Sequence, residues 1–293
     1  MTDLQAVDPI SGPVVCQFFG IFDGISKDQY GRIVAKAPFD KCNLLILAFV
    51  HAVQNDKGEY VAQFTNGRDN GFPYDPKDSD ADRVNLIVQT ARNKNPGIRI
   101  LLSLGYDGNE VGNAASTPVP FADSVRALAE TYGLNGLDID FEFPDSIHSS
   151  ALLTLAQQLR TSLNAAKPKR PVVLTITPAQ KEGLDAKALQ AFDYTMPQSY
   201  GNNPSYADQY AKILNNSYSQ IVYGVSTEGP IGQTNDPADY VAAAKKAAGF
   251  FGWRLDNDSL SPPPAPFPTF TNAIKMWQLM HAADADFRAP IAS

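Results

Sequence analysis

Short apolar runs alternate along the whole chain with polar loops and helical patterns. A helical pattern is shown by Phe121, Val125, Leu128 and Tyr132, which lie at offsets of four, seven and eleven. Strands that read as nearly continuous apolar runs, each followed by a helix, are typical of βα units on a parallel sheet. The predicted strands are 14–19, 43–50, 98–104, 133–144, 172–177, 194–200, 220–226 and 250–256.

Two segments compete for the position of the eighth strand. Residues 273–277 are followed by only 16 residues, and Ile274, Trp277 and His281 have helical offsets. Residues 250–256 follow a helical pattern and precede a proline-rich loop, which leads into that last helix. We therefore predict that Trp253 lies on the eighth strand and that Trp277 is a core residue of the last helix.

Eight βα units leave no residues for a second domain, so the predicted fold is a single (β/α)8 TIM barrel of the α/β class. The active site of such a barrel lies at the carboxyl-terminal ends of its strands. We predict an N-terminal extension over 1–13, the barrel over 14–288 and a C-terminal tail over 289–293. A doubly wound open sheet is the alternative, but no G-x-G-x-x-G follows the first strand.

The composition of the chain argues against some classes of binding partner. The formal charge of −7 is mild and spread along the 293 residues, which argues against a nucleic acid or an anionic membrane. No apolar run approaches the roughly 20 residues that span a bilayer. The first residues have neither a basic start nor an apolar segment, so no signal peptide is visible. The protein stays inside, leaves by another route, or is a trimmed form that works outside the cell.

Cysteine and histidine show no metal-site spacing. Cys16 and Cys42 each lie at or beside a predicted strand, where a disulfide fits but two buried free thiols are favoured. The three histidines are scattered. We expect no zinc, no haem and no other cofactor.

Three carboxylates mark the fourth predicted strand. Asp138, Asp140 and Glu142 alternate with large apolar residues, so they share one face of the strand. Second neighbours on a strand lie roughly 6.6 Å apart, where like charges interact strongly. An edge strand with its acids in water is the simpler interpretation, but Pro144 ends the apolar run abruptly. We therefore place the three acids at the barrel mouth, with Glu142 outermost.

Carboxyls in unequal environments suit acid–base chemistry on glycosides. The outer acid must hold a proton near neutral pH, and the inner pair is expected to share a proton and titrate as a unit. A conventional retaining site also needs a nucleophilic carboxylate about 5 Å across the cleft. Asp193, Glu228 and Asp256 lie at other strand ends, but none has an equally marked setting. This indicates a nucleophile that belongs to the substrate.

Residues 135–142 resemble the D-G-x-D-x-D-x-E signature of glycoside hydrolase family 18, the chitinases and endo-β-N-acetylglucosaminidases. Four of the five fixed positions match; Asn135 replaces the first Asp, which we expect to be a structural change. Matches in order on other strands extend the resemblance over nearly the whole barrel, although Tyr106 stands where a second glycine is usual. They are Ala48-Phe49, Ser103-Leu104-Gly105, Thr177-Pro178-Ala179-Gln180, 198–204 and Trp253.

The resemblance implies a mechanism that proceeds through an oxazolinium ion formed by the substrate's own 2-acetamido group. Glu142 would protonate the glycosidic oxygen, Asp140 would hold the acetamido N–H, and Asp138 would tune Asp140. A fixed carboxylate there agrees with the physics, because the charge develops only in the transition state. The other implied contacts are Tyr200 on the acetamido oxygen, Gln198 nearby, and Trp253 as the hydrophobic floor of the −1 sugar.

Each of these substrate contacts has a structural alternative. Trp253 fits a barrel-core aromatic, and Gln198 and Tyr200 fit strand residues with satisfied hydrogen bonds. Phe18, like Phe49, suits packing as well as sugar stacking. Ser103 is predicted to bind substrate, and Tyr106 would narrow the −1 or the −2 site. The aromatic residues of a long loop over 51–78 either wall the cleft or form a small separate core.

We expect an endo-acting hydrolase of β-1,4-linked N-acetylglucosamine, in chitin or chito-oligosaccharides, working as a monomer. About 20 residues separate the last two strands, which leaves no room for the extra domain that deepens some chitinase clefts. One alternative is cleavage of the chitobiose core of N-glycans by the same residues. The other is a non-catalytic lectin or inhibitor, which the presence of Glu142 disfavours.

Overall fold

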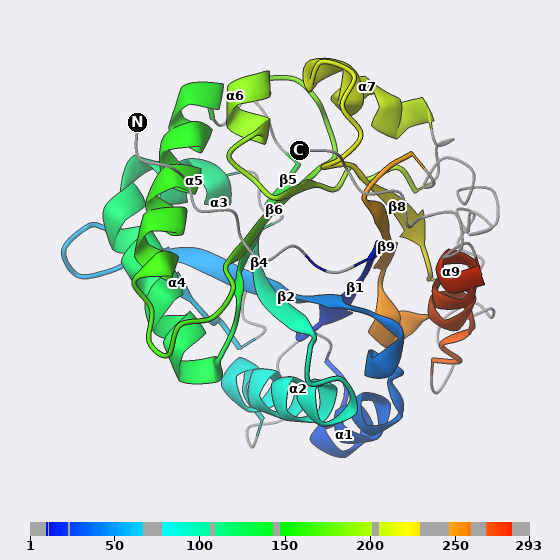
Figure 1. The fold of residues 1–293 in the computed structure, drawn as a ribbon. Coiled ribbons are helices and arrows are strands. Elements are labelled where there is room, and N and C mark those ends of the chain that lie inside the picture. Colours follow the sequence, from blue (N-terminus) through cyan, green and yellow to red (C-terminus); the bar gives the residue numbers. More distant parts are fainter. Residues whose placement is uncertain are drawn as a thin grey trace.

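The computed structural model describes residues 10, 12–22, 24–66, 78–105, 109–142, 147–200, 205–228, 246–258 and 268–282. Eight parallel strands lie in the order β7-β6-β5-β4-β2-β1-β9-β8. A parallel bridge between Thr195 and Ile221 joins the two ends of this order, so the barrel is nearly closed. Figure 1 looks along the barrel, with the strands at the centre and the helices around them. The predicted (β/α)8 fold is confirmed.

The elements follow the predicted alternation of strand and helix. The barrel strands are β1 Val14–Gly20, β2 Leu44–Gln54, β4 Arg99–Gly105, β5 Gly136–Phe141, β6 Val173–Pro178, β7 Tyr194–Thr195, β8 Val222–Ser226 and β9 Gly249–Trp253. The described helices are α1 Lys27–Lys36, α2 Asp80–Lys94, α3 Glu110–Ser116, α4 Pro118–Tyr132, α5 Ser149–Asn164, α6 Ala186–Leu189, α7 Ser205–Ile213 and α9 Thr271–Ala282. Short 3-10 turns lie at Phe39–Lys41 and Leu255–Asn257. None of these helices is long and apolar enough to cross a membrane.

Alternate residues of each strand enter two different apolar layers. On β1, Cys16 and Phe18 point into the barrel, whereas Val15 and Phe19 pack against the surrounding helices. Apolar side chains fill the inner layer below the acids, toward the amino-terminal ends of the strands. The barrel is therefore a packed core and not a pore. Only at the carboxyl-terminal ends of the strands does the interior become polar.

Local signals in the sequence set the ends of two helices. Ser79 caps α2, because its side chain accepts a hydrogen bond from the Asp82 N–H. Gly133 ends α4 with φ 71°, a left-handed conformation that a residue with a Cβ rarely adopts. The chain then turns directly into β5, which carries the acids.

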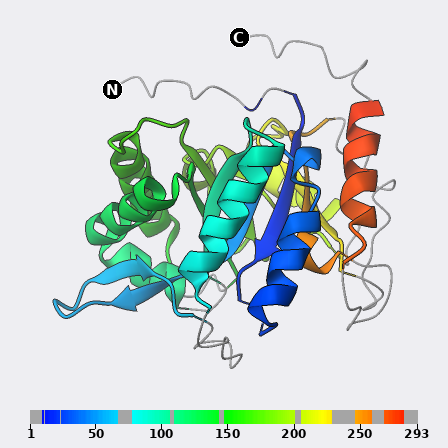
Figure 2. The same ribbon diagram turned by 90° about the horizontal axis from the view of Figure 1, so that it is seen from below.

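The loop predicted over 51–78 is wrong in its first part. β2 continues to Gln54 and pairs antiparallel with β3, Tyr60–Gln63. This hairpin projects from the end of the barrel at which the strands finish (Figure 2). Phe64 packs edge-on against Tyr132 at 5.7 Å, and both rings pack against the main core between the barrel and its helices, so Phe64 forms neither a separate small core nor a cleft wall. Phe72 and Tyr74 lie outside the described residues.

The strand predicted over 194–200 is also shorter in the structure. β7 has only two residues, since Pro197 has no N–H to donate to the sheet. The chain nevertheless stays beside β6: Met196 N donates to Ile176 O at 2.8 Å and Gln198 N to Pro178 O at 3.0 Å. Residues 196–200 therefore still run along the barrel wall to the mouth.

The two tryptophans lie where the sequence predicts them. Trp253 ends β9, and Trp277 is a half-buried residue of α9 that stacks on His281 at 3.7 Å. Cys16 and Cys42 are free thiols, as favoured, and burial raises the pKa of both. The tail predicted over 289–293 and most of the extension predicted over 1–13 lie outside the described residues.

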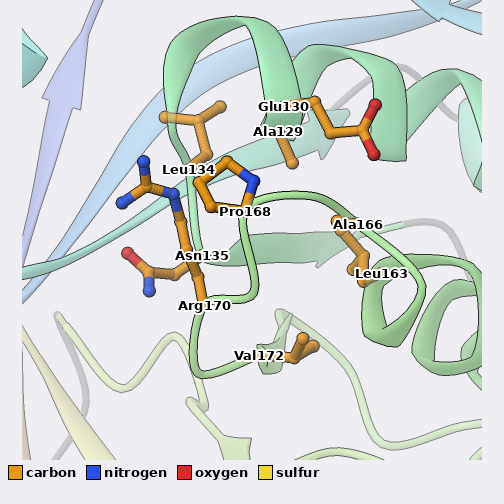
Figure 3. A pocket seen from close by; sticks show the side chains of 9 residues that line it. All are labelled: Ala129, Glu130, Leu134, Asn135, Leu163, Ala166, Pro168, Arg170 and Val172. Carbon is orange, nitrogen blue, oxygen red and sulfur yellow. The ribbon is translucent and has the colours of Figure 1, made fainter.

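Asn135 serves a structural purpose at the amino-terminal end of the barrel. Its Oδ1 accepts a hydrogen bond from Ile100 N at 3.1 Å, and its Nδ2 donates to Pro171 O at 3.0 Å. An aspartate has no donor for the Pro171 carbonyl, so the amide suits this position and our expectation of a structural change is confirmed. A narrow cavity beside Asn135 lies at the opposite end of β5 from the acids (Figure 3); it is lined by Ala129, Glu130, Leu134, Leu163, Ala166, Pro168, Arg170 and Val172.

Asp258 joins the chain after β9 to the start of α9. Its Oδ2 accepts from Ala273 N at 2.7 Å and its Oδ1 from Asn272 N at 3.2 Å. The side chain is buried, and burial raises the pKa of the carboxyl to about 6. Relative to the unfolded chain, the folded protein therefore favours the protonated form of Asp258 over the ionised form.

This shift predicts how stability changes with pH. The folded pKa exceeds the unfolded value of about 3.9, so the stability that Asp258 contributes is fully present below pH ~4 and is lost as the pH rises through 6. We expect a loss of about 2 kcal/mol from this group between pH 4 and pH 7. Urea unfolding of the wild type and of Asp258→Asn at both pH values measures it. Equal pH dependence in the two proteins would contradict the prediction.

Candidate active site

The three acids of β5 lie at the mouth of the barrel. Asp138 and Asp140 are buried, and Glu142, one residue beyond the strand, is half-buried. The register of the sheet places Asp138 between Ser103 on β4 and Thr175 on β6. The period of two in the sequence therefore produces a row of acids that leads from the interior to the surface.

Asp138 is held by three hydroxyl groups. Ser103 Oγ donates to its Oδ2 at 2.7 Å, and Thr175 and Thr177 Oγ1 donate to its Oδ1 at 2.5 and 2.8 Å. Burial raises the pKa of Asp138, and the three hydroxyls oppose that rise because they stabilise the carboxylate. Ser103 is fully buried behind Asp138. Its hydroxyl serves the carboxylate, which corrects the direct sugar contact predicted from the sequence.

Asp140 is the more perturbed of the inner pair. Burial, then the charge of Glu142, then that of Asp138 raise its pKa well above the usual range, and a hydrogen bond from Gln198 opposes them. Asp138 accepts from three hydroxyls, whereas the described side-chain donor to Asp140 is Gln198, so the cost of burying a charge is less well compensated at Asp140. Gly105 passes close by with φ 121°: a Cβ there would lie 3.1 Å from the Asp140 carbonyl oxygen. A glycine is needed at this point.

Gln198 bridges the two outer acids. Its Nε2 donates to Asp140 Oδ1 and to Glu142 Oε1, both at 2.8 Å, and lies 3.4 Å from Thr177 O. The side chain arrives from residues 196–200, across the sheet from β5. The structure thus brings a predicted substrate-binding residue into direct contact with both carboxyls.

An aromatic cluster lies across the mouth from the acids. Trp253 is half-buried and contacts Phe18 at 5.4 Å and Phe49 at 6.1 Å between ring centroids. Phe18 is buried beneath it, so Phe18 supports Trp253 and does not present a face to solvent. Phe22, which the sequence analysis missed, stacks on Phe49 at 5.6 Å. Trp253, being half-buried, leaves part of its ring accessible to a sugar.

Tyr200 stands between the aromatic cluster and the acids. Its ring meets Phe251 edge-on at 6.0 Å. Burial raises the pKa of its hydroxyl well above the usual range, and Asp140, Glu142 and Glu228 raise it further. The phenol therefore stays protonated and remains a hydrogen-bond donor at the mouth.

The other acids considered from the sequence have different partners. Glu228 accepts from Arg254 Nε at 3.2 Å and Asn257 Nδ2 at 2.8 Å. Asp256 accepts from Gly20 N at 2.8 Å. Asp193 pairs with Arg160 at 3.0 Å at the far end of the barrel. None of the three lies in a setting suited to a nucleophile, which agrees with a nucleophile supplied by the substrate.

Several groups that shape this site were not predicted from the sequence. Thr175 and Thr177 face Asp138. Their alternation along the predicted fifth strand places both on one face of that strand. To predict that they meet Asp138, the register between the two strands must also be known. Arg254 follows Trp253 directly, and its guanidinium lies over the Phe22 ring at 4.6 Å. Tyr106, the departure from the family pattern, lies outside the described residues.

Fold and site together define a glycosidase-type α/β barrel, with acids at the carboxyl-terminal end and an aromatic floor opposite them. The chain belongs to the glycosyl hydrolases family 18, whose family model matches residues 17–254. The resemblance drawn from the motifs is thereby confirmed.

Similarity to individual proteins is more distant. Chitinase B of Serratia marcescens is 32% identical over 105 residues, covering 31% of this chain and 21% of that protein. The class V chitinase of Arabidopsis thaliana is 26% identical over 206 residues, covering 60% of this chain and 51% of that protein. The chain thus spans about half or less of the length of these curated relatives.

Solved structures share the fold at low sequence identity. A mutant class V chitinase from Nicotiana tobaccum, in complex with NAG4, has a TM-score of 0.65 at 14% identity, covering 92% of this chain and 99% of that one. A chitinase-like agglutinin from Robinia pseudoacacia has a TM-score of 0.61 at 14% identity, covering 89% and 99%. Enzymes and an agglutinin therefore use the same barrel.

Proposed function

We propose that this protein hydrolyses β-1,4-linked N-acetylglucosamine in chitin or chito-oligosaccharides. The observation that carries the proposal is the row Asp138, Asp140 and Glu142, joined by Gln198, at the mouth of the barrel. Membership of a chitinase-containing family supports the substrate class. We include cleavage within the polymer chain, because the predicted connection between the last two strands is too short for a cleft-deepening domain.

The proposed mechanism is retaining and substrate-assisted. Glu142 gives a proton to the glycosidic oxygen as the C1–O bond breaks. The acetamido carbonyl oxygen of the substrate attacks C1 from the other side and forms an oxazolinium ion. Water then opens that ion at C1, with Glu142 taking a proton from the water, so the β configuration returns.

Asp140 and its neighbours act on the charge that develops in this first step. Asp140 accepts the acetamido N–H and balances the positive charge of the oxazolinium ion. Asp138, held by its three hydroxyls, lies behind Asp140, and its charge raises the pKa of Asp140. Tyr200 donates to the acetamido oxygen, and Trp253 with Phe49 forms the floor beneath the sugar.

Two other functions use the same groups. Cleavage of N-glycan chitobiose cores needs the same acids and differs only in what surrounds the reacting sugar. A non-catalytic lectin is a second candidate because the Robinia pseudoacacia agglutinin shares the barrel. Glu142 disfavours the lectin, since a binding protein has no use for a proton donor at this position.

Product analysis separates the three functions. N-acetylglucosamine hexamer and a high-mannose glycoprotein are incubated with the protein between pH 4 and pH 8. We expect shorter oligomers with β configuration at the new reducing end, observed by proton NMR, and an unchanged glycoprotein mass. Loss of glycan from the glycoprotein would favour the second function, and hexamer binding without any release would favour the lectin.

A further inference from the structure

Trp253 and Arg254 are neighbours in the chain, and their side chains lie at the two ends of one row of aromatic rings. Phe22 stacks on Phe49 at 5.6 Å between ring centroids, with 14° between the ring planes. Phe49 in turn contacts Trp253 at 6.1 Å. The Arg254 guanidinium lies over the Phe22 ring, 4.6 Å from its centroid. We call Phe22, Phe49 and Trp253 the aromatic row, and Arg254 covers the end of the row opposite Trp253.

Two carboxylates hold the Arg254 side chain, which is buried. Its Nε donates to Glu228 Oε1 at 3.2 Å, and its Nη1 lies 3.5 Å from Asp256 Oδ2. Asp256 also accepts from Gly20 N at 2.8 Å, at the end of β1. A Cβ on Gly20 would collide with Arg254 Nη1, so the glycine leaves the space that the guanidinium occupies. The guanidinium is therefore fixed between the ends of β1, β8 and β9.

The two carboxylates would accept any cation, but the contact with Phe22 requires a guanidinium. A guanidinium is planar and weakly hydrated, so it can stack on an aromatic ring while its edge keeps its hydrogen bonds. An ammonium is a compact, strongly hydrated charge without a face to stack. Arg254→Lys would thus keep a positive charge near Glu228 and remove the cover of Phe22. One substitution therefore separates the two roles of Arg254.

The position of Trp253 depends on the rings that surround it. Phe18 is buried beneath the indole and contacts it at 5.4 Å, whereas Phe49 connects the indole to Phe22. Phe22 is only half-buried and lies just beyond β1, so apolar packing holds it less tightly than it holds Phe18. Because neighbouring rings in a packed cluster limit one another's movement, the cation over Phe22 also restricts Phe49 and, through it, Trp253.

We propose that Arg254 is a positioning residue that holds Trp253, through Phe22 and Phe49, where the indole can bind a sugar. The proposal rests on the proposed function, in which Trp253 and Phe49 form the floor beneath the sugar. Such a floor contacts the sugar in the ground state and in the transition state alike. A displaced floor therefore weakens binding much more than it slows the chemical step.

Arg254→Lys tests the proposal on KM and kcat separately. We expect KM for N-acetylglucosamine tetramer to rise about 10-fold, with kcat within about 3-fold of the wild type. Phe22→Leu should raise KM as well. The double variant should lose little more than either single variant, because both substitutions break the same contact. Losses that multiply in the double variant would show that Arg254 does not act through Phe22, and a loss confined to kcat would overturn the proposal.

Arg160→Lys is the matched control for structural damage. Arg160 is largely buried and pairs with Asp193 at 3.0 Å, at the far end of the barrel. The same chemical change there should lower the thermal unfolding temperature and leave KM for the tetramer unchanged. A rise of KM in Arg160→Lys as large as that in Arg254→Lys would mean that a general loosening of the fold causes both, and would overturn the proposal.

The fluorescence of Trp253 reports its position without turnover. The chain has two tryptophans, so Trp277→Phe leaves Trp253 as the single one. In this background we expect the acrylamide quenching constant to rise after Arg254→Lys, because a less restricted indole is more accessible, and to stay unchanged after Arg160→Lys. An unchanged constant in Arg254→Lys would reject the role of Arg254 alone. A wild type that cleaves no oligomer, with the quenching altered as expected, would reject the proposed function alone.

Discussion

Glu142→Gln is expected to reduce hydrolysis of chito-oligosaccharides by a factor of about 10²–10⁴ while leaving binding intact, because general acid catalysis typically contributes that much. Glutamine has the same shape, and its Oε1 still accepts from Gln198, so the contact at 2.8 Å survives. It has no proton to give to the glycosidic oxygen. The rate of tetramer cleavage and the tetramer affinity by calorimetry measure the two effects separately.

The matched control is Glu130→Gln, the same chemical change at an exposed position near the other end of the barrel. Its carboxylate accepts only from Lys167 N among its described contacts, so we expect the wild-type rate. A rate in Glu142→Gln within 10-fold of the wild type would show that this carboxyl is not the proton donor. Loss of tetramer binding would show that the variant has lost more than the proton.

The strand of acids and its position are predictable from sequence because both depend on local patterns. Alternation of Asp138, Asp140 and Glu142 with apolar residues places them on one face whatever the partner strands are. Trp253 is placed on β9 by the order of helix, strand and proline-rich loop. The chain order of elements is sufficient to give the barrel, since parallel strands joined by helices follow few topologies.

The contacts around the acids join residues that are far apart in the sequence, and no local pattern encodes such contacts. Gln198 lies 58 positions from Asp140, and Ser103 lies 35 positions from Asp138. Predicting either contact requires the register between strands, which is fixed by the packing of the entire barrel. Hence Ser103 was predicted to touch the sugar when its hydroxyl serves a carboxylate. The strand around Pro197 was predicted too long, because the apolar pattern of the sequence continues beyond the residues whose backbones pair in the sheet.

The second large effect is expected for Asp140→Asn, which removes a charge and keeps the shape. Asparagine Oδ1 still accepts from Gln198, so the side chain stays in place. It cannot balance the positive charge of an oxazolinium ion. A unit charge about 4 Å away is worth about 4 kcal/mol at an effective dielectric constant of 20, which corresponds to a rate about 10³-fold lower. The measurement is kcat on the tetramer, with KM expected to change little.

Asp138→Asn is the control variant for this prediction. The amide of asparagine turns one acceptor into a donor, and the Ser103 hydroxyl can rotate to accept from it, so the hydrogen-bonded network survives. Asp138 lies behind Asp140 and acts through it, by a charge that raises the pKa of Asp140, so we expect a smaller loss of about 10-fold. A loss in Asp138→Asn that equals or exceeds that in Asp140→Asn would mean that the inner acid bears the charge of the reaction. In that case the sugar would bind deeper in the barrel than the exposure of Trp253 and Tyr200 indicates.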